Sequence, residues 1–310
     1  MEDILYVVNN SENVKINEDE VKELANKIES SKYKHWYNTD ELFNSLSTNE
    51  NILFVFILES LNFCFWPNYQ WIVEYKGNSY HGSDSLLYSL TKAVESKKII
   101  LDIDELYKVS QEEFIKIFEC NKELPIMMEE RYKSFRNVIE TIHNKGFNNF
   151  INDLYNVRSS KDLEEYIVNN FETYDDKCEY KGRTIHFNKR CRLLIIDLFY
   201  TNKTIHNNIG NIDNLLGCAD YRIPQYLHDK GIFTYSDKLT EKIINKELIP
   251  YGSYEEIEIR ANTLCVLEMI KSIIKETNPT VTTAEIDNAL WRMSRSDKTD
   301  FIHHTMSIYY

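Results

Sequence analysis

Hydrophobic residues recur along most of this chain at helical spacing, with one strand-like interruption. Apolar positions at intervals of three and four predict amphipathic helices in four stretches, residues 1–50, 83–97, 103–120 and 255–276. Between the first two, apolar residues flank Lys76-Gly77-Asn78, which predicts a two-stranded hairpin with a glycine turn. The pattern predicts a mostly α-helical protein with a small β-hairpin.

Capping residues mark several helix starts. Thr282 and Glu285 have the spacing of a capping box, and Ser236 or Asp237 begins another helix. Asn38-Thr39-Asp40-Glu41 predicts a further start. Because no repeat, low-complexity stretch or clear linker interrupts the pattern, we expect one domain over 1–310, with a helical N-terminal portion, 1–50, packed on it.

Composition narrows the class of protein. The chain has 310 residues and a net charge of −13, which disfavours extended binding to DNA or RNA but allows a ligand with one phosphate. The six cysteines never form a zinc spacing, so we expect buried thiols and no metal. Met1 is followed by two acidic residues and no apolar run approaches ~18 residues. These features predict a cytoplasmic protein without membrane association; they leave its oligomeric state open.

The stretch 218–225 carries a candidate catalytic group. Asp220 precedes a predicted short helix, 223–230, whose free N–H groups would stabilise its carboxylate as the anion. A helix cap with no further role is the alternative, and from these residues alone it is favoured.

A second polar cluster begins an apolar helix. Lys189, Arg190 and Arg192 lie at its N-terminal end, where the helix dipole disfavours cations unless an anion docks there. Ion pairing with nearby carboxylates would explain the cluster as well. Asp197, deep in the same apolar run, is expected to be paired.

Aromatic residues offer a third candidate feature. Phe63, Phe65 and Trp66 could be core, which is the favoured interpretation, or a slot that stacks on a planar heterocycle. A carboxylate, cations and such a slot, with no dinucleotide, P-loop, zincin or hydrolase motif and no cofactor signal, are compatible with cleavage of a glycosidic bond to a heterocycle.

Several sequence blocks, taken together, are specific. In chain order they are Asn62-Phe63-Cys64-Phe65-Trp66, Glu74-Tyr75-Lys76-Gly77 with Tyr80 and Gly82, Pro125 with Glu129-Glu130-Arg131, Phe187 with Lys189-Arg190, Ala219-Asp220-Tyr221-Arg222-Ile223-Pro224-Gln225, Tyr235-Ser236, Tyr251-Gly252, Glu256-Ile257-Glu258-Ile259-Arg260, and His303 with Ile308-Tyr309-Tyr310. From about residue 50 to 310 the chain resembles the queuosine salvage proteins, a family of queuosine 5′-phosphate N-glycosylase/hydrolases.

The resemblance implies a helical single domain distantly like the helix-hairpin-helix DNA glycosylases. It implies release of queuine from queuosine 5′-monophosphate, a small-molecule substrate, for tRNA modification. Asp220 looks like the catalytic carboxylate and Lys189 like the cation that holds the phosphate. Phe65 and Trp66 would stack on the deazaguanine. Three further residues are expected at the substrate-binding site: Arg190, Tyr221 and Arg222. Arg222, Glu258 and Arg260 would serve a buried ion-pair network equally well.

One block departs from the family pattern. After Tyr80 and Gly82 many relatives carry an aromatic pair, whereas this chain has Ser83-Asp84. We hypothesise that Asp84 contacts the amine of the cyclopentenediol arm. Two other functions stay open at this point, a non-catalytic queuine-binding protein and a base-excision glycosylase acting on DNA or RNA.

Overall fold

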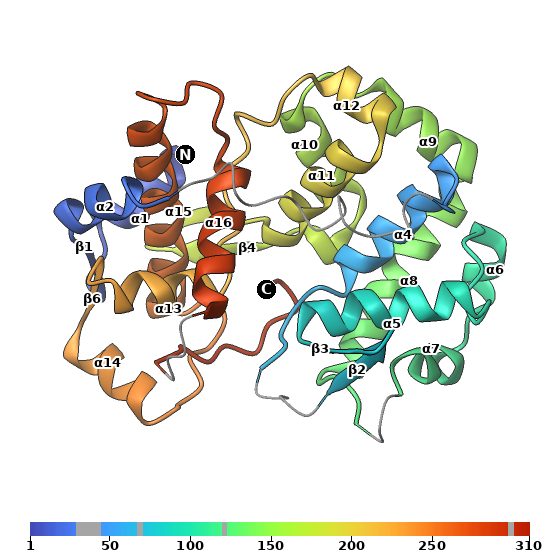
Figure 1. The fold of residues 1–310 in the computed structure, drawn as a ribbon, viewed down its shortest axis with the longest axis horizontal. Coiled ribbons are helices and arrows are strands. Elements are labelled where there is room, and N and C mark those ends of the chain that lie inside the picture. The colour runs from blue at the N-terminus through green and yellow to red at the C-terminus, as the bar shows by residue number, and fades with distance from the viewer. Residues whose placement is uncertain (29–44, 67–70, 120–122, 297–300) are drawn as a thin grey trace.

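The computed structural model describes residues 1–28, 45–66, 71–119, 123–296 and 301–310. Its helices form two groups that lie side by side (Figure 1). The first group, on the right, comprises α4 (Thr48–Ser60), β2 (Ile72–Tyr75), β3 (Asn78–His81), α5 (Ser83–Glu95), α6 (Ile103–Lys108), α7 (Gln111–Phe118), α8 (Met128–Lys145), α9 (Phe147–Asn156), α10 (Ser160–Asn170), the short 3-10 helix η3 (Glu172–Tyr174), α11 (Lys189–Thr201) and α12 (Lys203–Ile209).

The second group, on the left, contains both early and late segments of the chain. It comprises α1 (Glu2–Asn9), β1 (Val14–Ile16), α2 (Glu18–Ala25), β4 (Lys177–Tyr180), β5 (Arg183–His186), α13 (Arg222–Asp229), β6 (Phe233–Tyr235), α14 (Asp237–Ile244), α15 (Tyr254–Ile274) and α16 (Thr283–Ser296). The mostly helical class predicted from the sequence is confirmed.

Each group has its own hydrophobic core. In the first, α4 is buried along residues 51–60 and packs against α11. Ser47 and Glu50 start α4 with a reciprocal capping box, which satisfies two of its free N–H groups. In the second, α15 is the central helix and contacts α1, α2 and α16. Because α4 is apolar on all sides, it can only be stable enclosed by other elements.

In the described part of the chain, three two-stranded antiparallel sheets support the helices. The predicted hairpin is β2–β3, and a second hairpin is formed by β4 and β5. The third sheet pairs β1 with β6, Val14 opposite Tyr235, and so joins segments more than 200 residues apart. Among the described residues, no helix is both long enough and apolar enough to cross a membrane.

The structure corrects some sequence predictions. The single helix expected over 103–120 is two helices, because Ser110 and Glu113 form a capping box that starts α7. Neither β1 nor the β4–β5 hairpin was expected. The caps of α14 and α16 are confirmed at Ser236 and Thr282. The helix start predicted at 38–41 lies outside the described residues.

Candidate active site

Several of the predicted site residues lie where the two groups of helices meet. A small apolar cluster, Phe63, Cys64 and Trp66, lies there with Tyr221 and Ile308 packed against it. The Cys64 N–H donates to the carbonyl of Tyr310 at 3.0 Å, which ties the loop after α4 to the C-terminus of the chain. That terminus lies near the middle of the molecule, between the two groups (Figure 1).

Asp220 caps helix α13, as the sequence predicted. Its Oδ1 accepts the N–H groups of Arg222 at 2.7 Å and Ile223 at 3.2 Å. The side chain is only half-buried, so it stays within reach of a ligand. The two backbone N–H donors and the positive end of the helix dipole favour a negative charge at this position. Tyr221 extends from the same turn onto the Phe63–Trp66 cluster, which places the carboxylate beside aromatic groups.

The first turn of α11 carries two cations with different surroundings. Lys189 is buried, and its Nζ lies 3.5 Å from the carbonyl of Asn62. Arg190 donates to the carbonyls of Ser60 and Thr173 and, at 3.0 Å, to Thr173 Oγ1. Burial lowers the pKa of Arg190 to about 10. Arg190 therefore connects the end of α4 to η3, whereas the hydrogen bond from Lys189 to the Asn62 carbonyl is long.

Arg192 and Asp287 hold the turn that precedes Asp220. Arg192 donates to Glu164 Oε1 and to the carbonyl of Gly217, both at 3.2 Å. The Cys218 N–H donates to Asp287 Oδ2 at 2.6 Å. Burial, followed by the charge of Asp220, raises the pKa of Asp287 to about 8, although the Cys218 N–H, Lys189 and Arg192 oppose the shift. Sequence reasoning missed Asp287, because nothing in its helical context marks a site.

A buried carboxyl pair lies beneath Lys189. Burial raises the pKa of Glu59, against the opposing effects of Lys189, Asn62, Asp197 and Arg190. Asp197 is also buried and lies near another acid, Glu59, and its pairing stays a prediction.

The aromatic residues of the site are stacked within the protein. Phe65 lies parallel to Trp71 at a centroid distance of 6.4 Å, and Trp66 lies on His304 at 4.5 Å. The buried Arg131 donates to the carbonyls of Leu61, Phe63 and Cys64 and so fixes this loop. The Arg131 guanidinium also lies 5.1 Å from the centre of the Phe65 ring, so Phe65 has neighbours in Trp71 and Arg131, and Trp66 has one in His304.

The remaining predicted residues lie in different surroundings. Asp84 forms an ion pair of 2.8 Å with Arg295, which links α5 to α16. The Arg222 guanidinium lies 5.9 Å from the centre of the Tyr221 ring. Arg260 pairs with Asp176 at 2.5 Å and with Glu256, all fully buried.

Glu258 accepts the N–H groups of residues 12 and 13, together with the Tyr180 hydroxyl. These contacts favour the ion-pair interpretation for Arg260 and a structural role for Glu258.

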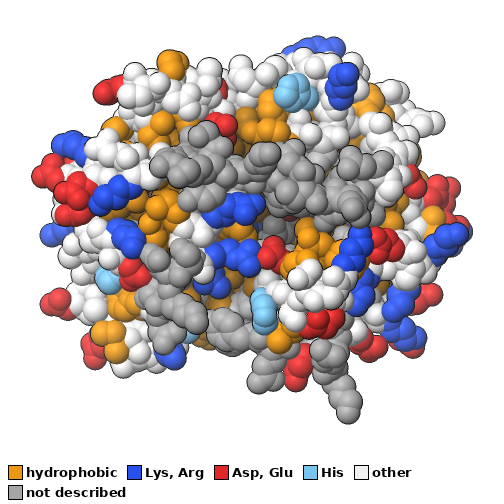
Figure 2. Space-filling view, viewed as in Figure 1, with side chains coloured by type: hydrophobic (Ala, Val, Ile, Leu, Met, Phe, Trp, Pro, Cys, Tyr) orange, Lys and Arg blue, Asp and Glu red, His pale blue; other side chains and the backbone are white. Residues whose placement is uncertain are grey.

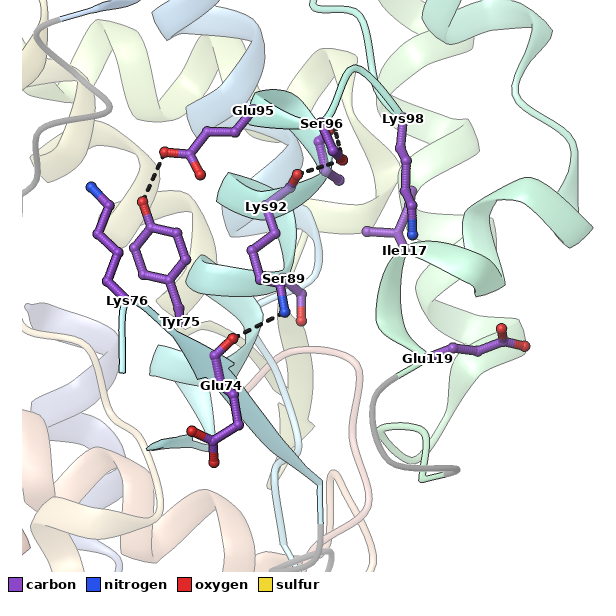
Figure 3. A pocket seen from close by; sticks show the side chains of 11 residues that line it. Glu74, Tyr75, Lys76, Ser89, Lys92, Glu95, Ser96, Lys98, Ile117 and Glu119 are labelled. Atoms are coloured by element: carbon purple, nitrogen blue, oxygen red, sulfur yellow. Dashed lines mark hydrogen bonds between the residues drawn. The ribbon is translucent and has the colours of Figure 1, made fainter. Parts of the chain in front are cut away.

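The surface agrees with this location. Figure 2 shows lysine and arginine side chains gathered in the middle of the face on which the two groups meet, next to a hollow. A separate open pocket of about 580 Å³ lies on the first group, between the hairpin, α5 and the end of α7. It is lined by exposed Glu and Lys side chains and by Tyr75, and none of the predicted site residues reaches it (Figure 3).

Comparison with known proteins decides the family. The queuosine salvage protein family matches residues 43–310. The chain belongs to this family. It is 30% identical to a protein of Dictyostelium discoideum over 97% of this chain and 95% of that one. It is 27% identical to a Bos taurus protein, covering 98% and 96%, and 28% identical to one from Sphaerobacter thermophilus, covering 83% and 80%. Each of the three is named queuosine 5′-phosphate N-glycosylase/hydrolase.

The family match covers every segment that builds the site. The loop after α4, the start of α11, the Asp220 turn and the C-terminal residues 301–310 all lie within it. Residues 1–28, which precede the match, contribute α1, β1 and α2 to the second core and none of the predicted site residues.

Proposed function

We propose that this protein hydrolyses the N-glycosidic bond of queuosine 5′-monophosphate and releases queuine and ribose 5-phosphate. Family membership and the names of its relatives supply the substrate. The observation that carries the chemistry is the Asp220 carboxylate, which accepts two N–H groups at the N-terminus of α13 and adjoins Tyr221, a residue packed on the Phe63–Trp66 cluster.

The reaction needs an anion beside the ribose. As the C1′–N bond breaks, its electron pair goes to the base and positive charge develops on the sugar, so a fixed carboxylate stabilises the transition state more than the ground state. Asp220 is well suited, since two backbone N–H groups fix one oxygen of a carboxylate that is only half-buried. The same carboxylate can accept a proton from the attacking water, whose oxygen bonds to C1′.

Lys189 is assigned to the phosphate. Its ammonium is buried, has only a long 3.5 Å hydrogen bond to Asn62 within the described residues, and lies at the N-terminus of α11, where the helix dipole also favours an anion. We expect Phe65, Trp66 and Tyr221 to flank the base. Release of the product base would feed its reuse in tRNA modification.

The test is incubation of the purified protein with queuosine 5′-monophosphate, with free base followed by chromatography. Asp220→Asn keeps the shape and the capping oxygen but removes the charge, so we expect turnover to fall at least roughly 100-fold. Asp102→Asn is the matched control, because Asp102 caps α6 in the same way, through two N–H groups, on an exposed surface.

The outcomes separate the possible functions. Full turnover by Asp220→Asn would move catalysis to another group. No release by the wild type, with queuine bound tightly, would identify a binding protein instead of an enzyme.

A further inference from the structure

The turn that carries Asp220 is clamped from two helices. Arg192 of α11 donates to the Gly217 carbonyl, and Asp287 of α16 accepts the next N–H, that of Cys218. Gly217 has no room for a side chain, since a Cβ there would lie 2.3 Å from a Leu267 methyl and 2.9 Å from Asp287 Oδ2. Asp220 follows Cys218 by only two residues, so any movement of this turn moves the catalytic carboxylate.

The charges around Asp287 come from several elements. Asp220 and the Cys218 thiol face it from the turn, and Lys189 and Arg192 face it from α11. Glu59 of α4 faces the same thiol, and Glu268 and Lys271 of α15 bind Thr283, one turn earlier on α16.

Burial and the neighbouring Asp220 raise the pKa of Asp287 to about 8. At pH 7 Asp287 is therefore mostly neutral.

We propose that Asp287 is a positioning residue for Asp220: its carboxyl group fixes the Gly217–Cys218 turn and determines how much negative charge lies beside the catalytic carboxylate. The proposal rests on the proposed glycosylase function. When Asp287 ionises, a second buried anion competes with the substrate phosphate for Lys189 and repels Asp220. Above pH 8 the protein should therefore bind its substrate less well.

The test is the pH dependence of kcat and KM for the wild type, Asp287→Asn and Glu285→Gln. In the wild type we expect kcat/KM to fall roughly tenfold between pH 8 and 9.5, mainly through KM, as a group with this pKa ionises. Asn retains an oxygen for the Cys218 N–H but cannot ionise, so this alkaline fall should disappear. Glu285→Gln makes the same chemical change on α16 at its capping box, away from the turn, and should keep the wild-type profile.

Asp287→Ala tests the clamp itself. Loss of the acceptor leaves the Cys218 N–H buried without a partner, so kcat should fall at least tenfold at every pH. Circular dichroism and thermal melting show whether this variant is folded. If it is not, the Asn variant and an infrared titration decide the matter, because a carboxyl band that titrates near pH 8 must vanish in Asp287→Asn.

The two hypotheses fail in different ways. No release of base by the wild type would overturn the proposed function. An active wild type with the same alkaline fall in Asp287→Asn would overturn the inference, and so would the absence of a carboxyl group titrating near pH 8, whatever the turnover.

Discussion

Lys189 and Arg190 are adjacent in the sequence, and the structure predicts opposite consequences for their substitution. Arg190→Met should destabilise the protein, whereas Lys189→Met should abolish most activity in a protein of nearly normal stability. Methionine keeps much of the length of both side chains and removes only the charged head. The comparison therefore isolates what each cation contributes.

The magnitude for Arg190 follows from its contacts. Substitution removes the donors to the carbonyls of Ser60 and Thr173 and to the Thr173 hydroxyl, at roughly 1.5–3 kcal/mol for each hydrogen bond to a charged group. Substitution also removes the cost of burying the charge. Burial lowers the pKa of Arg190 to about 10, and this cost of about 3 kcal/mol offsets part of the lost hydrogen bonding. The net loss of unfolding free energy is therefore roughly 2–5 kcal/mol, or about 4–10 °C in Tm.

Lys189 contributes less to the fold than Arg190, because the one hydrogen bond of its ammonium within the described part of the chain is the 3.5 Å contact with the Asn62 carbonyl, although its charge also acts on the buried carboxyls of Glu59 and Asp287. Loss of one partner from a buried charge pair with a phosphate costs roughly 2–5 kcal/mol, which lowers kcat/KM roughly 30-fold to several thousand-fold. For the dephosphorylated nucleoside, which cannot form that pair, Lys189→Met should lower kcat/KM much less than it does for the nucleotide.

Thermal melting and steady-state kinetics on both variants check this reasoning. A Tm for Lys189→Met as low as that of Arg190→Met, together with retained turnover per folded molecule, would refute it. Equal losses of kcat/KM on nucleotide and nucleoside would show that Lys189 does not bind the phosphate.

Two further predictions concern other parts of the chain. Asp84→Ala should weaken the binding of queuosine 5′-monophosphate more than the binding of an analogue that lacks the cyclopentenediol arm. Equal losses of affinity for the two ligands, matched by those of Arg295→Met, would assign to Asp84 only its 2.8 Å ion pair with Arg295. Burial, with smaller effects of His304 and Arg260, lowers the pKa of His303 to about 3, so its contribution to stability is complete above pH 6.5 and is lost as the pH falls toward 3. Between pH 7 and pH 5 the unfolding free energy of His303→Gln should therefore fall by about 2 kcal/mol less than that of the wild type. Urea titrations that show the same fall in both proteins would contradict this.

The sequence predicted well those features that depend on local chemistry. Asp220 could be recognised as a helix cap because the turn, the proline and the helix that it caps are contiguous, and the structure confirms both N–H contacts. The β2–β3 hairpin was likewise predictable, since Lys76 and Gly77 both adopt positive φ angles at the turn between the strands.

Features that depend on distant partners could not be predicted in this way. Strand β1 is three residues long and exists because β6, more than 200 residues later, pairs with it. Asp287 faces the Asp220 turn only through the packing of α16 against the rest of the second group. The same holds for Arg190, whose basic character indicated an anion site but whose partners are carbonyls of α4 and η3.

The location of the site follows from how the two cores are joined. Neither core could hold several unpaired charges, because an isolated buried ion is too costly, whereas the boundary between the cores supplies helix ends from both sides. Asp220 comes from the second group, at the start of α13, and Lys189 from the first, at the start of α11. Their distance from one another is therefore set by the packing between the groups, with Asp287 and Arg192 fixing the turn from either side. Substitutions at this boundary should consequently alter catalysis before they unfold either core.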